Sequence, residues 1–176
     1  LSKELSSLRA VKDEHELACM RTAAAIASEA LLGMLPDLRP GLEEREIALE
    51  LDVRMRRAGA EEISFPTIVA SGRHAALPHA TPGVRRIEAG DTVVIDYGAV
   101  FQGYHSDETC TFFVGRPDDE ARGVYEQVLR AHNLALASLR AGVACRDVDR
   151  VARDALREAG LERFFTHGTG HGVGLD

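Results

Sequence analysis

Several features that define other classes of protein are missing from this sequence of 176 residues. No apolar run approaches the ~20 residues that a membrane-spanning helix needs, so no membrane partner is expected. No signal peptide is visible, although the chain starts at Leu1 rather than at methionine, which makes that absence weak evidence. The formal net charge of −7 argues against a nucleic-acid partner, because such a partner needs a basic surface.

Cysteine is scarce as well. The three cysteines, Cys19, Cys110 and Cys145, are odd in number and far apart. They offer no C-x-x-C spacing of the kind that zinc sites use. Scattered reduced thiols are typical of a cytoplasmic protein, and a cytoplasmic location is therefore expected.

Nucleotide-binding loops are also absent. The glycines of H-G-T-G-H-G-V-G-L-D, residues 167–176, do not fit G-x-G-x-x-G, because Val173 or Leu175 stands where the third glycine is required. The sequence has no G-x-x-x-x-G-K-[ST] motif either. The glycine-rich backbone here more plausibly allows close approach of a substrate or a metal.

The stretch Thr92–Val114 predicts two strands joined by a short turn, with one aspartate on each arm. A turn centred on Phe101–Gln102 would place Asp96 directly opposite Asp107. Like charges opposed on one face of a sheet are destabilising, so the pair would need a shared proton or a cation. A divalent metal is the favoured interpretation, and two solvated aspartates are the alternative.

An internal repeat relates the two halves of the chain. Segments beginning at Leu38 and Leu139 align without gaps at an offset of 101 residues, and Gly41/Gly142 and Gly59/Gly160 coincide. Chance similarity of two amphipathic helices is the alternative. The repeat predicts two helix–helix–sheet halves, an α+β fold with helices on one face of a largely antiparallel sheet.

Residues 1–12 resemble a lead-in or linker before these halves. Capping and periodicity predict helices at about 14–35, 43–58, 118–140 and 146–159, and strands at 61–70 and from 163 to 166. The counterparts of Asp96 and Asp107 would fall near positions 197 and 208, beyond the last residue. The second half is therefore expected to be incomplete.

Three residues supply candidate metal ligands. Asp96 and Asp107 offer hard oxygen atoms, and His171 offers an imidazole from the glycine-rich stretch. This mixture suits Mn, Co, Zn or Fe better than Ca or Mg. Thr109 shares a strand face with Asp107 and could hydrogen-bond a ligand, or be an ordinary β-branched strand residue.

Two further histidines are candidates for contact with a substrate. His167 lies four residues before His171, and His79 lies in a loop between Pro78 and Pro82. A lone histidine is more often structural or solvated than catalytic, so His79 alone carries little weight. Two histidines in one glycine-rich stretch, His167 and His171, are stronger evidence for a functional site.

Three motifs together resemble the pita-bread metallopeptidases. They are V-I-D-Y-G-A-x-x-x-G-Y-x-S-D-x-T (94–109), P-H-A-x-P (78–82) and H-G-T-G-H-G-V-G-L-D (167–176). The S-D-x-T form and the P-H loop are similar to the Xaa-Pro branch of aminopeptidases and dipeptidases (prolidases). The resemblance implies a pita-bread fold, with residues 13–176 as a catalytic domain that has one complete half and one truncated half.

The resemblance also assigns roles residue by residue. It implies that Asp96, Asp107 and His171 bind metal in a centre of two divalent ions, Mn or Co before Zn or Fe. His79 and His167 match catalytic histidines that contact the substrate. The implied substrates are short peptides with proline at the second position, and a homodimer is left open. Cys110 departs from the family pattern, which has arginine there.

Three rival interpretations remain open. Methionine aminopeptidase belongs to the same family, and a substrate panel would distinguish it. The 176-residue chain by itself could be a non-catalytic fragment, because the family's two glutamate ligands lie C-terminal to the glycine-rich motif. A metal-free enzyme of the creatinase type is disfavoured, because both aspartates and His171 are present.

Overall fold

The computed structural model describes residues 3–176 and divides them into two compact units. Among the described residues, unit 1 comprises residues 3–117 and 173–176, and unit 2 comprises residues 118–172. Each unit has its own cluster of buried apolar side chains. Part of the expected lead-in is helical, because α1 spans Lys3–Ala10.

Unit 1 is built on two helices, α2 (Glu14–Met34) and α3 (Glu44–Arg57). A capping box begins α2: Asp13 accepts from the Glu16 amide, and Glu16 accepts from the Asp13 amide, both at 2.8 Å. With the 3-10 turn Leu35–Asp37 that follows, α2 is long and apolar enough to cross a membrane by length and composition. The expectation that no membrane partner binds stays a prediction, because this property alone does not test it. Seven residues of α2 are nevertheless buried in this unit, so length and composition do not assign the helix to a membrane.

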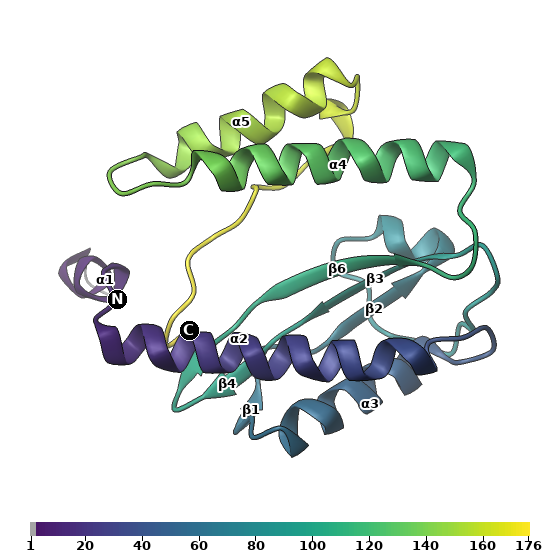
Figure 1. The fold of residues 1–176 in the computed structure, drawn as a ribbon, viewed down its shortest axis with the longest axis horizontal. Helices are drawn as coiled ribbons and strands as arrows, with labels where there is room; N and C mark the ends of the chain where they lie inside the picture. Colours follow the sequence, from purple (N-terminus) through teal and green to yellow (C-terminus); the bar gives the residue numbers. More distant parts are fainter. Residues whose placement is uncertain (1–2) are drawn as a thin grey trace. The chain divides into compact units, whose positions relative to one another are not determined.

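Six short strands form two three-stranded sheets in unit 1 (Figure 1). The first sheet has the order β1 (Glu62–Ile63), β4 (Ala99–Phe101) and β5 (Tyr104–His105). The second has the order β2 (Ile68–Ser71), β3 (Thr92–Tyr97) and β6 (Glu108–Phe113). The strand predicted at 61–70 is thus two strands that pair in different sheets, with Pro66 between them.

One face of the second sheet packs on the two helices. Val93, Ile95 and Tyr97 alternate along β3, are at most 1% exposed, and join the core that includes Leu51 and Met55 of α3. Because successive side chains of a strand point to opposite faces, Asp96 belongs to the other face. Helix packing therefore fixes which face of the sheet carries the aspartate.

The hairpin has a different register from the one predicted. Asp96 pairs with Thr109 and Phe101 with Tyr104, so the turn is at Gln102–Gly103 and not at Phe101–Gln102. Gln102 and Gly103 have φ values of 49° and 77°. Positive φ at both positions is typical of the type I′ turn, which matches the twist of a hairpin. The direct opposition of Asp96 and Asp107 was therefore a wrong prediction.

Unit 2 is a hairpin of two helices, α4 (Asp119–Ser138) and α5 (Cys145–Glu158). Asp118 begins α4 by accepting from the Ala121 amide at 2.7 Å. The strand expected at 163–166 is wrong, because Glu162–Phe164 is a 3-10 turn. A strand needs a partner, and none of the described strands pairs with this segment.

The internal repeat is visible in the structure. Shifted by 101 residues, the bounds of α3 coincide with those of α5 at both ends. Gly59 and Gly160, which follow these helices, both have positive φ, at 110° and 72°. Agreement of helix bounds and terminating conformation favours a true repeat over chance similarity.

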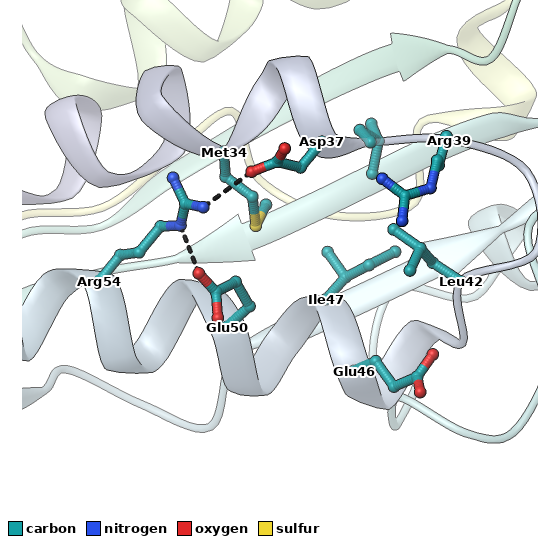
Figure 2. A pocket seen from close by; sticks show the side chains of 9 residues that line it. Met34, Asp37, Arg39, Leu42, Glu46, Ile47, Glu50 and Arg54 are labelled. Atoms are coloured by element: carbon teal, nitrogen blue, oxygen red, sulfur yellow. Dashed lines mark hydrogen bonds and ion pairs between the residues drawn. The ribbon is translucent and has the colours of Figure 1, made fainter.

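Each unit also has a pocket at the same place in the repeat. The pocket of unit 1 lies beside α3. Figure 2 shows Arg54 at one end of it, joined to Asp37 and Glu50. These ion pairs measure 2.8 Å and 2.6 Å. Its apolar lining recurs in unit 2 at the same offset: Met34/Ala135, Leu38/Leu139, Leu42/Val143 and Ile47/Val148. In unit 2 the glycine-rich residues 168–172 also line the pocket.

Candidate metal centre

Asp96 and Thr109 form the best-defined part of the candidate centre. They are paired across β3 and β6, and the Thr109 hydroxyl donates a 2.7 Å hydrogen bond to Asp96 Oδ1. This contact orients the Asp96 carboxylate on the sheet face opposite to the helices. The hydrogen bond anticipated for Thr109 is present, and its acceptor is Asp96.

Asp107 lies beside this pair rather than opposite Asp96. It precedes β6 by one residue, and side chains two apart along a strand share a face, so it lies on the side of Thr109. Diagonal neighbours in an antiparallel pair are ~7–8 Å apart. Carboxylates that are too far apart to share one proton can each contribute oxygen ligands to a centre of two cations.

The Cys110 position belongs to the other face of the strand. Cys110 pairs with buried Ile95 and packs against the core, where burial raises the pKa of its thiol. Burial likewise raises the pKa of Tyr97, and the neighbouring Glu108 carboxylate adds to the effect. Replacing arginine by Cys110 therefore changes the layer under the sheet and leaves the face of Asp96 and Thr109 unaltered.

A buried carboxylate holds the loop that carries His79. Glu44, at the start of α3, is fully buried and accepts hydrogen bonds from the Ser71 amide at 2.8 Å and the Gly83 amide at 3.2 Å. It also contacts the Ser71 hydroxyl at 2.7 Å and His74 Nδ1 at 3.1 Å. One side chain thus fixes both ends of the loop Ser71–Gly83, while His79 itself is exposed.

The pKa of Glu44 reflects two opposing influences. Burial raises it, but the hydrogen bonds from Ser71, His74 and Gly83 outweigh burial, and the pKa is lowered from its ordinary value of 4.5. The carboxylate is therefore ionised at neutral pH, and acceptance of these bonds depends on that charge.

The two histidines of the glycine-rich segment lie in unit 2 and are exposed. The His167 ring packs edge-on against Phe165, with ring centroids 4.8 Å apart and planes at 76°. In each histidine, Nδ1 lies within 3 Å of the carbonyl of the following glycine, at 2.8 Å for His167 and 2.9 Å for His171. An Nδ1–H donor there would leave Nε2 as the ring nitrogen for a metal or a substrate.

The predicted ligands are divided between the units. Asp96 and Asp107 belong to unit 1 and His171 to unit 2. Across residues 3–176, no three His, Cys, Asp or Glu side chains are grouped closely enough to hold a metal ion. The ligand roles of all three residues, and the substrate roles of His79 and His167, therefore stay predictions.

Comparison with known proteins identifies the family. The model of metallopeptidase family M24 matches residues 18–176. The chain belongs to this family. The fold resemblance is also confirmed, because the Xaa-Pro dipeptidase from Bacillus anthracis superimposes with a TM-score of 0.98 at 40% identity over 100% of this M24 chain.

Two other relatives of the M24 chain are called Xaa-Pro dipeptidase and X-Pro aminopeptidase. The Xaa-Pro dipeptidase of Pyrococcus horikoshii is 40% identical over 172 residues, which are 98% of this chain and 49% of the relative. The X-Pro aminopeptidase from Thermotoga maritima has a TM-score of 0.97 at 41% identity, covering 100% of this chain and 50% of that one. The chain thus spans about half the length of the relatives that it matches.

Sequence reasoning missed several residues that support the site. Glu44 was not singled out from the sequence, although it holds the His79 loop. Asp149 and Arg153 on α5 went unremarked, although both contact the glycine-rich segment. The four-residue spacing of Asp149 and Arg153 was a signal for an ion pair on one helix face. No signal in the sequence indicated that this ion pair contacts the glycine-rich segment.

Proposed function

We propose that the full-length protein containing this chain hydrolyses the peptide bond between an N-terminal residue and a following proline. The observation that carries the proposal is the pair Asp96–Thr109, with Asp107 diagonal to it, on the face of the sheet away from the helices. Relatives called Xaa-Pro dipeptidase and X-Pro aminopeptidase support the substrate class.

The residues present are chemically suited to divalent cations. Asp96 and Asp107 supply carboxylate oxygens, and His171 supplies an imidazole nitrogen. When bound, two such ions would supply Lewis-acid activation of water and of the scissile carbonyl. We propose Mn or Co as these ions, with Zn or Fe as alternatives, because mixed oxygen and nitrogen donors suit all four.

The chain's own residues have separate tasks in this hypothesis. Thr109 holds the Asp96 carboxylate in one orientation through its hydroxyl. His167 and His79 contact the substrate, where an imidazole can donate a proton or stabilise developing negative charge. Short peptides with proline second are the partners. A cytoplasmic location and a homodimer belong to the same proposal.

Peptide hydrolysis by the full-length protein tests the proposal. Xaa-Pro dipeptides and tripeptides would be offered after chelation and again after addition of Mn or Co, beside peptides that begin with methionine and lack proline. We expect metal-dependent release of the residue before proline, and abolition of that release by Asp96→Asn. No turnover of any Xaa-Pro peptide would refute the proposal, and preference for the methionine peptides would support methionine aminopeptidase instead.

A second hypothesis concerns residues 1–176 alone. Because this piece contains only three candidate ligands, Asp96, Asp107 and His171, we propose that by itself it is inactive and binds metal weakly. Metal analysis after gel filtration, done together with the peptide assay, tests this. A tightly bound pair of ions in active 1–176 would contradict it.

A further inference from the structure

Two charged residues of α5 form an ion pair that faces the glycine-rich segment. Asp149 and Arg153 are one helical turn apart, and Arg153 Nε donates to Asp149 Oδ2 at 2.7 Å. Both side chains are 30% exposed, so the pair is partly sheltered. Each partner keeps other polar atoms with which to contact the segment 165–169.

Arg153 holds the first part of this segment. Its two terminal nitrogens donate to the Phe165 carbonyl at 3.1 Å and to the His167 carbonyl at 2.6 Å. Its guanidinium also lies 4.6 Å from the centroid of the Phe165 ring, against which the His167 ring packs. A planar fork with several fixed donors can make these contacts together, whereas a single ammonium cannot.

Asp149 holds the second part. Its Oδ1 accepts from both the amide and the hydroxyl of Thr169, at 3.0 Å and 2.8 Å. The segment is therefore attached to α5 on both sides of the His167 ring. Arg153 holds the carbonyls of Phe165 and His167, and Asp149 holds Thr169. The hydrogen bonds to Arg153 and Thr169 also lower the pKa of Asp149.

Packing does little to fix this part of the chain. A Cβ atom placed at Gly168, Gly170 or Gly172 would meet nothing within 4 Å. Glycine has the greatest conformational freedom of any residue, so such a segment needs polar anchors to keep one conformation. Asp149 and Arg153 supply those anchors on the N-terminal side of His171.

We propose that Asp149 and Arg153 are positioning residues that hold His167 in the orientation needed for proline-directed hydrolysis, an inference that rests on the proposed function of this histidine. They touch neither substrate nor metal in this hypothesis, and they act through the backbone and ring of His167. Displacement of a reacting group by about 1 Å can cost about 100-fold in rate, which sets the expected effect.

A double-mutant cycle in the full-length protein tests the inference. Arg153→Lys keeps the charge and loses the fork, and we expect kcat for an Xaa-Pro dipeptide to fall about 100-fold with little change in KM. In a His167→Ala background the same substitution should have almost no further effect on kcat, because the residue through which it acts is gone. A purely structural role would lower kcat by the same factor in both backgrounds.

A matched control is available on the same helix. Arg150 makes an i,i+3 ion pair with Asp147 at 3.4 Å, and no hydrogen bond or ion pair joins it to the described segment 165–169. Arg150→Lys should leave kcat unchanged. Equal losses for Arg150→Lys and Arg153→Lys, or additive effects of Arg153→Lys and His167→Ala, would overturn the inference.

A second measurement does not depend on turnover. The ring current of Phe165 should shift the ring-proton NMR signals of His167, given the 4.8 Å edge-on contact. Arg153→Lys and Asp149→Ala should move these signals toward those of an unstructured histidine, whereas Arg150→Lys should not. If the wild type cleaves no Xaa-Pro peptide, the proposed function fails. Unchanged His167 signals would then overturn the positioning inference as well.

Discussion

At the scale of single residues, the pairing of Asp96 with Thr109 matters more than the count of carboxylates. The predicted opposition of Asp96 and Asp107 suggested a repulsion in need of a cation. The actual register gives Asp96 a hydroxyl donor at 2.7 Å and moves Asp107 to the diagonal position. A carboxylate that is already oriented needs less reorganisation to bind a cation.

Thr109→Val should weaken the centre without disturbing the fold. Valine keeps the β-branched shape and removes the hydrogen bond to Asp96. Loss of such a supporting contact typically lowers metal affinity or activity about 10–100-fold. Metal titration of the full-length protein measures the effect. Thr111→Val, two residues along the same strand and opposite Val94, is the control and should bind metal normally.

The buried carboxylate of Glu44 should make stability depend on pH. Its pKa is lower in the folded protein than the ordinary 4.5, so its stabilising effect is present above about that pH and is lost as pH falls through the lower folded value. Glu44→Gln should cost about 1–3 kcal/mol at pH 7, because its amide group would face the Gly83 amide as a second donor.

Denaturant unfolding of this variant between pH 3 and pH 7 would measure both effects. The difference between wild type and Glu44→Gln should shrink as the pH falls through the lowered pKa of the wild-type carboxyl, because that group then becomes protonated. Asp37→Asn, on a largely exposed carboxylate, is the control and should cost little at any pH. A difference that stays constant with pH would refute this account of Glu44.

At the scale of elements, the hairpin depends on one close approach that the sequence did not reveal. Between β3 and β4, a Cβ atom at Gly98 would lie 2.0 Å from the Ser106 carbonyl oxygen. Ser106 in turn exchanges hydrogen bonds with Ala99 through its amide at 2.9 Å and its hydroxyl at 3.1 Å. The crossing from one sheet to the other therefore requires glycine.

Gly98→Ala should destabilise unit 1 strongly. Backbone atoms must move to admit the methyl group, and overpacking of this kind costs ~1–3 kcal/mol or more. Gly123→Ala in α4 provides the opposite case, since a Cβ there meets nothing within 4 Å. It should stabilise the helix by ~1 kcal/mol. Thermal unfolding of both variants would compare them, and equal shifts would contradict the proposed clash.

At the scale of the whole molecule, the chain has two separate cores. The core of unit 1 joins α2 and α3 to the sheet, and the core of unit 2 joins α4 to α5. The repeat explains why the helix pairs are alike. Their surroundings differ, because unit 1 contains the described strands and unit 2 contains none of them.

Leu51→Ala should therefore act on unit 1. Leu51 is completely buried, and truncation of such a residue costs about 2–5 kcal/mol. Hydrogen exchange should show faster opening of β3 and β6, while protection of α4 and α5 changes little. Leu156→Ala, in the core of unit 2, is the reciprocal variant and should affect α4 and α5 instead. Equal loss of protection in both units from either variant would refute this separation.

Local sequence signals were sufficient to locate the main helices and to indicate the family, without knowledge of the tertiary structure. The capping box at Asp13 and Glu16, the cap at Asp118 and the repeat of 101 residues located helices to within a few residues, because caps and helical periodicity act over one or two turns. The motifs around Asp96, His79 and His171 also carried the family resemblance that the M24 match bears out.

Tertiary structure decided the features that depend on distant partners. The hairpin register was set by the turn at Gln102–Gly103 and by the packing of Ile95 and Tyr97 on the helices. The predicted register differed from this one by two residues. Because a two-residue shift keeps every side chain on its face, hydrophobic alternation could not detect the wrong register. The anchoring of loops by Glu44 and by Arg153 joins residues that no local pattern links. Sequence thus identified the chemical groups of the candidate centre, and long-range packing determined which of them are held in place.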